Sequence, residues 1–218
     1  MMVNAPCKLC ERKRARRHCP ALGSDICPTC CGAERENSID CPASCEFLQE
    51  ARLRERPEPL PEDQVPNQDI RVTEEFLRSH DDLVVFLSTA LARAIEAERA
   101  VDQDAREALA AIIRTYRTRE SGLIYETRPN NPYAAKLQDA LTLAIEELHK
   151  SLAESSGMQS LRDTDILGVL VFLQRIELPY QNNRRRGRAF SHFLSQSFPA
   201  QPATAIDVPL ADAPLIEL

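Results

Sequence analysis

The chain has 218 residues, which allows one domain, or one domain with a small additional module. Aromatic residues make up only 5% of it and glycines number 6, and this scarcity argues against an all-β fold. The formal net charge of −6 argues against general nucleic-acid binding through bulk charge, so any such activity has to come from a local patch.

The first residues show no charged region followed by an apolar run, and no apolar stretch approaches the roughly 18 residues of a membrane span. We therefore expect a soluble protein of the cytoplasm that has no membrane partner. Thiols stay reduced in that compartment, so the cysteines are expected to bind metal rather than to form disulfides.

The N-terminal segment, residues 1–56, holds every cysteine of the chain. Two C-x2-C pairs and one C-x3-C pair occur in it, and each spacing lets two thiolates bind the same ion. Zn²⁺ suits four thiolates in a tetrahedron; an iron–sulfur cluster and a dithiol redox site are the alternatives. A site that four thiolates close has no open position for water or substrate, so it is structural rather than catalytic.

The cysteine spacing resembles that of treble-clef and cross-brace zinc fingers of the HIT and MYND type, in which ligand pairs one and three bind one ion and pairs two and four bind the other. This resemblance implies two zinc ions per chain. The ligands of site one are then Cys7, Cys10, Cys27 and Cys30. The second pair departs from the pattern, because Leu22 stands where a partner of Cys19 is expected, and the adjacent Cys31 replaces it. The ligands of site two are then Cys19, Cys31, Cys41 and Cys45, with His18 as the alternative fourth ligand.

Proline follows both Cys27 and Cys41, and proline suits the first turn of a helix. We therefore expect short helices over 28–36 and 42–55, with Cys41 and Cys45 on one helix face. A basic loop, residues 11–17, separates the first cysteine pair from Cys19. It either binds phosphate or an acidic partner, or is a solvated loop that offsets the thiolate charge. Its basic residues are Arg12, Lys13, Arg14, Arg16 and Arg17. The run from Cys19 to Leu48 is also similar to one that recurs in bacterial proteins, and that similarity implies no particular activity.

Four prolines in residues 57–70 predict an extended linker. The periodicity of apolar residues over 71–198 predicts a bundle of about five helices, and the short loops favour an up-and-down arrangement of antiparallel neighbours. The expected helices span about 73–100, with a break near His80, and about 103–119, 132–154, 163–178 and 186–198. Residues 199–218 again hold four prolines and are expected to form a flexible tail.

Two loops of the predicted bundle combine Tyr, Asn and Arg, a composition that suits a phosphate, a carboxylate-bearing peptide or an unpaired base. They span 122–133 and 180–190, and an up-and-down bundle places them at the same end. Arginine at the start of the last helix faces the wrong end of the macrodipole, which adds some weight to a negatively charged ligand. The alternative is that the asparagines form turns and the arginines form a solvated face. The residues expected to bind a partner are Tyr125, Arg128, Tyr180, Arg184, Arg185, Arg186 and Arg188, beside Asn130, Asn131, Tyr133, Asn182 and Asn183.

The sequence contains no phosphate-cradling glycine loop and no Ser/His/Asp or Cys/His signature, so we expect no enzymatic activity. It predicts an all-helical bundle with a small N-terminal zinc-binding module, acting as a non-enzymatic adaptor that binds another protein. The alternatives are binding of RNA or another nucleic acid through the arginine loops and residues 11–17, an enzyme of another type, and a thiol-based redox sensor. The sequence leaves the oligomeric state open.

Overall fold

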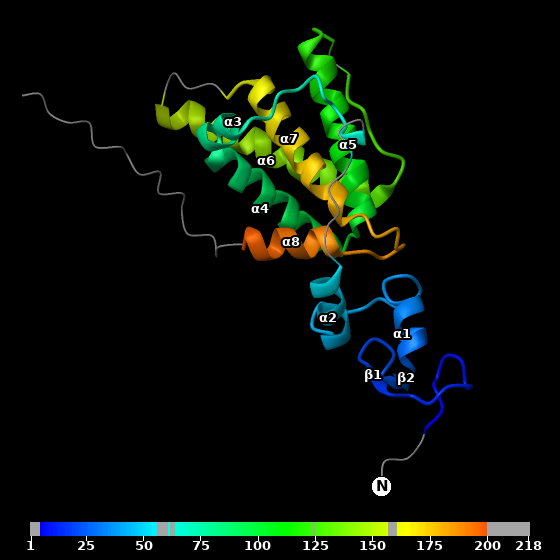
Figure 1. Cartoon of the computed structure of the whole chain (residues 1–218). Helices are drawn as coiled ribbons and strands as arrows, with labels where there is room; N and C mark the ends of the chain where they lie inside the picture. Colours follow the sequence, from blue (N-terminus) through cyan, green and yellow to red (C-terminus); the bar gives the residue numbers. More distant parts are fainter. Residues whose placement is uncertain (1–4, 56–60, 62–63, 124, 157–160, 200–218) are drawn as a thin grey trace, which may run out of the picture.

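The structure is a computed structural model that describes residues 5–55, 61, 64–123, 125–156 and 161–199. Among these residues, eight α-helices make up most of the fold and two short strands form a sheet. Figure 1 shows a small cysteine-rich module below a larger bundle of helices, with α8 (Ala189–Ser197) on the side of the bundle that faces the module. The expectation of a mostly helical fold with an N-terminal cysteine cluster is confirmed.

The module begins with a β-hairpin. Strands β1 (Arg17–Cys19) and β2 (Ser24–Ile26) pair antiparallel. Gly23 in the turn has a φ of 57°, a left-handed conformation that glycine adopts without steric cost. The hydrophobic cluster of the module consists of buried cysteines together with Ile26 and Ile39. An apolar core this small does not stabilise a module alone, which is the usual reason for metal ligands in such folds.

Helix α1 (Pro28–Glu34) begins where the sequence predicted it. Pro28 occupies the first turn, and the Sγ atom of the N-cap Cys27 accepts a hydrogen bond from the backbone N–H of Cys30 at 3.4 Å. The helix therefore presents one cysteine at its cap and another in its first turn.

Helix α2 (Glu46–Arg54) starts later than predicted, with Cys45 as its N-cap. The residues before it form a turn in which the N–H of Cys45 donates to the carbonyl of Pro42 at 2.9 Å. The expected helix over 42–55 is therefore wrong at its start, and Cys41 and Cys45 do not share a helix face.

The bundle contains each of the predicted helical segments. The first is divided at His80, as expected, into α3 (Glu74–Ser79) and α4 (Asp81–Glu98). Thr73 caps α3, because its side chain accepts a hydrogen bond from the N–H of Phe76 at 3.1 Å. The other helices are α5 (Asp102–Glu120), α6 (Pro132–Ser156), α7 (Asp163–Glu177), the 3-10 turn η2 (Leu178–Tyr180) and α8.

Four helices form a ring around the bundle core. Helix α5 packs against α6 and α7, while α4 packs against α6 and also contacts α7 and α8. Helix α7 packs mainly against α5 and also contacts α4, and most of its residues are buried, which agrees with a sequence that leaves it little polar face. The buried residues of α7 include Ile166, Leu167, Val169, Leu170, Val171 and Leu173.

Helices α5 and α6 both begin at the same end of α5, so the expected up-and-down arrangement is wrong at their connection. Asn131, just before α6, donates to the carboxylate of Asp104 at the start of α5 at 2.7 Å. Thr118, near the end of α5, donates to the carbonyl of Tyr125 at 3.0 Å. The segment 121–131 therefore runs back along α5, and its length of about 36 Å when extended exceeds the roughly 28 Å length of that helix.

Residues ahead of α3 also lie against the bundle. Arg175 on α7 donates to the carbonyls of Asn67 at 2.6 Å and Ile70 at 2.9 Å, and Arg117 on α5 pairs with Asp69 at 2.7 Å. The last part of the predicted linker 57–70 is thus held by side chains of the bundle. Of the predicted linker and tail, residues 57–60, 62–63 and 200–218 lie outside the described residues.

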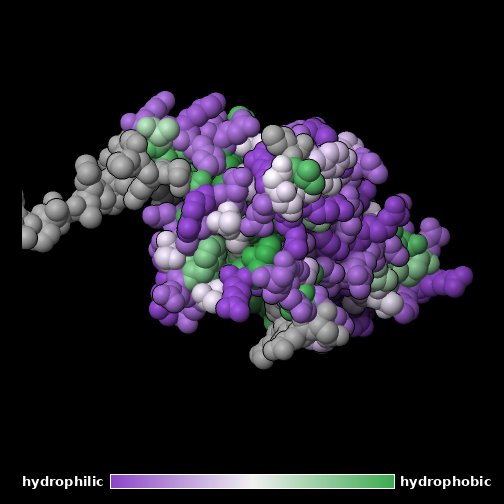
Figure 2. All heavy atoms as spheres, turned by 90° about the horizontal axis from the view of Figure 1, so that it is seen from above, coloured by the Kyte–Doolittle hydropathy of each residue, from purple (hydrophilic) through white to green (hydrophobic). Residues whose placement is uncertain are grey.

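The bundle face opposite to the module is mainly hydrophilic, with small and separated hydrophobic patches (Figure 2). Exposed apolar side chains such as Val85 and Leu143 are scattered, which is normal for a protein surface. Among the described residues, no helix has the length and the apolar character that crossing a bilayer requires.

Gly168 allows α3 to approach α7 closely. A Cβ atom at this position would lie 2.5 Å from Cζ of Phe76, whose ring stacks on His80 at 4.4 Å. We expect Gly168→Ala to lower the free energy of unfolding by about 1–3 kcal/mol, because the extra atom forces α3 outward. Denaturant titration followed by circular dichroism measures the change. The matched control is Gly32→Ala on α1, where a Cβ meets nothing within 4 Å, and equal stability of the two variants would contradict this packing.

Candidate metal centre

Four cysteines from two parts of the module converge on one point. Cys7 and Cys10 lie in the loop before β1, Cys27 and Cys30 lie at the start of α1, and their four Sγ atoms are all within 4.8 Å of one another. Cys7 and Cys27 are buried and the other two are partly buried. Four convergent thiols of this kind can hold a tetrahedral metal ion, and they are the residues expected for site one.

The local backbone turns these sulfur atoms toward one another. The N–H of Cys7 donates to the carbonyl of Lys13 at 2.8 Å, and the N–H of Glu11 donates to the carbonyl of Cys7 at 2.8 Å. Glu11 has a left-handed φ of 55°, so the chain folds into a tight knuckle. From the other side, the N–H of Cys27 donates to the Sγ of Cys7 at 3.1 Å. A backbone N–H aimed at sulfur stabilises the thiolate form that metal binding requires.

The thiols of this group differ in how readily they ionise. Burial opposes ionisation of Cys7, but N–H groups of Cys27, Cys10 and Leu9 outweigh it and lower the pKa of Cys7 to about 6. The neighbouring Cys27 thiol, together with burial, raises the pKa of Cys30 to about 12. Four sulfur atoms this close cannot all carry charge without a cation, so an ion that binds them all displaces protons.

The other four cysteines do not form a second group of this geometry among the described residues. Cys19, Cys31 and Cys45 are buried and Cys41 is partly buried. Nη1 of Arg17 lies 3.4 Å from the Sγ of Cys31. Burial raises the pKa of Cys41, and the nearby thiols of Cys45 and Cys19 raise it further. Cys19 and Cys45 therefore lie near Cys41, but no three of these cysteines have sulfur atoms that all lie within 4.8 Å of one another in the described part of the chain.

His18, the alternative ligand for site two, points away from the cysteines. Side chains alternate along a strand, so His18 lies on the opposite face of β1 from Cys19. Its side chain is 67% exposed, and its Nδ1 atom lies 3.0 Å from the carboxylate of Asp25.

The basic loop 11–17 remains largely at the surface. Arg12, Arg14 and Arg16 are exposed, and Nζ of Lys13 donates to the hydroxyl of Thr29 at 3.1 Å. Arg17 differs from them, because it is half-buried, with its guanidinium 4.6 Å from the centre of the Phe47 ring and close to Cys31. This one arginine thus joins the hairpin to α2 and places positive charge beside a thiol.

Glu36 joins the module to the bundle. It follows α1 after one residue, has a left-handed φ of 54°, and is only 3% exposed. Its carboxylate accepts hydrogen bonds from Nη2 of Arg52 at 2.8 Å, Nδ2 of Asn182 at 3.3 Å and the N–H of Arg188 at 3.2 Å. Its carbonyl accepts one from the N–H of Arg186 at 2.7 Å. A buried acid just beyond α1 therefore fixes the module to residues 182–188.

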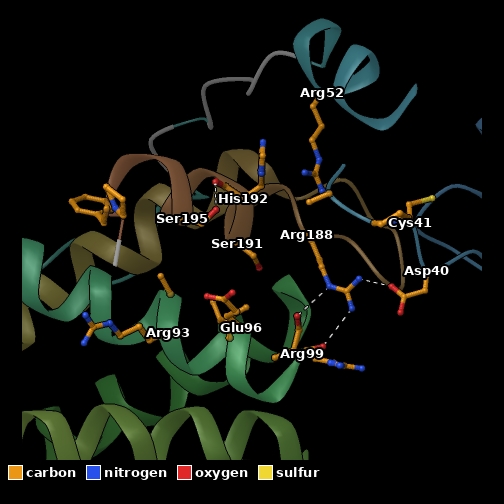
Figure 3. A pocket seen from close by; sticks show the side chains of 17 residues that line it. Asp40, Cys41, Arg52, Arg93, Glu96, Arg99, Arg188, Ser191, His192 and Ser195 are labelled. Carbon is orange, nitrogen blue, oxygen red and sulfur yellow. Dashed lines mark hydrogen bonds and ion pairs between the residues drawn. The ribbon is translucent and has the colours of Figure 1, made fainter. Parts of the chain in front are cut away.

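Two side chains of the second arginine loop reach the module as well. Nη1 of Arg184 donates to the carbonyl of Arg35 at 2.5 Å and to that of Gly32 at 3.3 Å. Nη1 of Arg188 pairs with Asp40, and its other nitrogens donate to carbonyls at the end of α4, as Figure 3 shows. Arg184 and Arg188 therefore have partners within the chain.

Arg185 and Arg186 remain exposed at this junction. The backbone N–H of Arg185 lies 3.4 Å from Oδ1 of Asn37, and the guanidinium of Arg186 lies 3.8 Å from the carboxylate of Asp40. Both side chains stay accessible to another molecule.

The negative charge at the start of α8 comes from α5. The carboxylate of Asp102 accepts hydrogen bonds from the N–H groups of Phe190 at 3.0 Å and Ser191 at 2.9 Å, and from the Ser191 hydroxyl at 2.5 Å. Burial raises the pKa of Asp102, and these hydrogen bonds oppose the shift. The arginines before α8 thus need no external anion to offset the macrodipole, which corrects the expectation from the sequence.

The first arginine loop does not join the second one. Tyr125 is exposed beside Thr118, and Arg128 pairs with Asp139 on α6 at 2.6 Å. Only the end of the loop, at Asn131, reaches the start of α5. The expectation that both loops meet at one end is wrong for Tyr125 and Arg128, because the returning segment carries them along α5.

Sequence reasoning missed Glu36, Asp40 and Arg52. A signal for the first two was present as charge, since the acid-rich stretch after α1 complements the RRRGR run of residues 184–188. No local pattern marked Arg52, which lies among other basic residues of α2.

No protein-family model, no curated protein sequence and no solved structure matches this chain. The site is therefore interpreted from its own geometry, which provides one four-cysteine group that can hold a metal ion and one polar junction with the bundle.

The substitution Glu36→Gln tests the junction. One carboxylate oxygen becomes an NH₂ group that faces other donors, and Arg52 loses its charged partner in a buried place. Breaking one side of a buried ion pair costs about 3–5 kcal/mol, so we expect a clear fall in the thermal midpoint and faster hydrogen exchange at the Arg188 amide. The matched control is Glu50→Gln, which breaks an exposed pair with Arg54 and should change stability by less than about 1 kcal/mol. Similar effects of the two changes would show that Glu36 does not hold the junction.

Proposed function

We propose that this protein is a zinc-binding adaptor that acts by binding another protein and catalyses no reaction. The observation that carries the proposal is the closed four-cysteine group, whose sulfur atoms lie within 4.8 Å of one another. Four thiolates around one ion leave no position for water or substrate, so the ion stabilises the module instead of taking part in chemistry. Because Glu36 holds the module against the bundle, the two bodies form one continuous surface that a partner can bind.

Zinc is the ion that this donor set favours, because it accepts four thiolates in a tetrahedron without a redox change. The knuckle at 7–10, the hairpin and the start of α1 correspond to the parts of a treble-clef finger, which supports the resemblance seen in the sequence. We include a second zinc ion at Cys19, Cys31, Cys41 and Cys45. In its favour, these neighbouring cysteines are free thiols and three of them are buried.

Elemental analysis tests the metal assignment. Protein purified without added metal should contain two zinc ions per chain, because each site binds zinc too tightly for ordinary purification buffers to remove it. Cys10→Ser should remove one ion and Cys45→Ser the other. If the unaltered protein contains one zinc ion, the assignment of site two is wrong. If it contains iron instead of zinc, the cysteines bind an iron–sulfur cluster and the zinc-finger assignment is wrong.

The partner surface that we propose includes the accessible basic side chains near the junction and in the basic loop. Arg185 and Arg186 are the first candidates, because they are exposed and, within the described part of the chain, their side chains make one long ion pair, from Arg186 to Asp40. Partner binding by the other residues named from the sequence stays a prediction, for Arg12, Lys13, Arg14, Arg16, Arg17, Tyr125, Arg128, Tyr180, Arg184 and Arg188.

One observation favours RNA as the second candidate partner. A cavity of about 380 Å³ is lined by Tyr180, Asn183 and Arg185 together with residues of α5. An aromatic ring beside amides and a guanidinium suits an unpaired base. The acidic charge of the whole chain acts against this alternative.

Affinity capture from native lysate, followed by binding measurements, separates these functions. We expect a defined protein to copurify, and Arg185→Glu with Arg186→Glu to weaken its binding about tenfold, or about 1.4 kcal/mol. Thermal stability should change by no more than about 0.5 kcal/mol for each exposed substitution. The control is Arg71→Glu with Arg114→Glu, an equal charge change at exposed positions of the bundle. Recovery of RNA with an affinity that falls steeply with salt would instead establish the second candidate.

A further inference from the structure

A pocket of about 560 Å³ opens between the module and the bundle. Residues 40–43 and Arg52 of the module line it on one side, and the end of α4 and α8 line the others. In Figure 3 Arg52 lies at the top, Asp40 and Cys41 lie at the right, and α4 lies below α8. Figure 3 shows Arg52 extending from α2 toward α8, close to His192. The pocket exists only while the module is docked, because neither body forms all of its walls.

The walls of the pocket carry more positive than negative charge. Arg52, Arg93, Arg99 and Arg188 line it, against Asp40 and Glu96. The chain as a whole has a net charge of −6, so this concentration of arginine is local. A cleft lined by one sign of charge raises the local concentration of ligands of the opposite sign.

Arg52 adds positive charge to the pocket, and one edge of its guanidinium is paired with an acid. Its side chain is 12% exposed, and Nη2 is bound to Glu36, while Nε and Nη1 are buried without a hydrogen-bond partner among the described residues. Burial lowers the pKa of His192, and the charge of Arg52 lowers it further, so the histidine beside it is neutral near pH 7. Glu36 also accepts from Asn182 and Arg188, so its charge is shared among several donors.

The pocket also has an apolar part. One side is lined by Ala92 and Ile95 of α4 and by Ala100 just after it. Another side is lined by Phe198 and Pro199. A volume of this size exceeds what a phosphate or sulfate ion fills, and lies in the range of sites that bury several ligand groups. The occupant therefore has to be both aliphatic and anionic. Apart from Phe198 and His192, the lining offers no ring on which bases could stack, which disfavours a nucleic acid.

We propose that this pocket binds a short segment of the partner protein in which aliphatic side chains alternate with Asp or Glu. This inference rests on the protein-binding function proposed above and assigns it a site and a class of partner. Carboxylates of the segment pair with Arg99 and Arg93 at the rim and offset the charge of Arg52 inside. Its aliphatic side chains cover the apolar side formed by α4 and Phe198. Because the segment contacts both bodies, it binds only while the zinc module is folded and docked on the bundle.

The direct test measures fluorescence anisotropy of a labelled peptide that alternates glutamate with leucine and valine, added to the zinc-loaded full chain. We expect saturable binding, and no binding of the same peptide with lysine in place of glutamate. Arg93→Glu and Arg99→Glu, made separately, should each weaken binding about tenfold. Arg114→Glu on α5, an equal charge change at an exposed position outside the pocket, should leave binding unchanged. Removal of zinc by a chelator should abolish binding.

Several results would overturn the proposal. Peptide binding that is unchanged in Arg93→Glu and Arg99→Glu, with both variants native by circular dichroism and thermal midpoint, excludes this pocket. Displacement of the peptide by millimolar inorganic phosphate alone would make it a small-anion site, and displacement by an oligouridine RNA would make it a nucleic-acid site. If the variants still capture the protein partner from lysate, the pocket assignment fails while the adaptor function stands. If no protein copurifies with the unaltered chain, the adaptor function itself fails.

Discussion

The carboxylate of Glu36 accepts hydrogen bonds from a guanidinium, an amide side chain and a backbone N–H, and it does so at a position that is 3% exposed. A buried acid is stable only when its oxygens are satisfied in this way, and here the donors come from both the module and the bundle. The residue lies just beyond α1, whose N-cap and first turn provide two of the four converging cysteines. The four-cysteine group is therefore linked to the helical body by one short stretch of chain.

The two bodies are stabilised by different forces. The bundle has a continuous apolar core from α4 to α8, whereas the buried cluster of the module is mostly sulfur. The contact between them is polar, with arginines and backbone groups from residues 182–188 facing acids and carbonyls of the module. Polar contacts of this kind are typical between domains that have separate cores. The junction consequently determines how the module is placed on the bundle.

Local patterns in the sequence were sufficient for the helices and for the cysteine pairs. The helices followed from apolar periodicity, whereas the grouping of Cys7 and Cys10 with Cys27 and Cys30 came from the resemblance to cross-brace zinc fingers. The turn before Cys45 was missed, because Pro42 suits a turn as well as a first helical turn. The return of residues 121–131 to the start of α5 was missed, because the length of a connection does not reveal whether it folds back. The partners of Arg184 and Arg188 were out of reach, since they depend on tertiary contacts between distant segments.

The contacts of Glu36 with residues 182 and 188 span 146 and 152 positions of the sequence. During synthesis the module leaves the ribosome long before its docking site, at about 5–20 residues per second. It can take up metal and fold while most of the bundle does not yet exist. At that stage the carboxylate of Glu36 is still hydrated, because residues 182–188, which later cover it, are synthesised near the end. Docking is accordingly a late step of assembly, and a nascent chain that stops before residue 182 would carry a folded module with nothing to hold it.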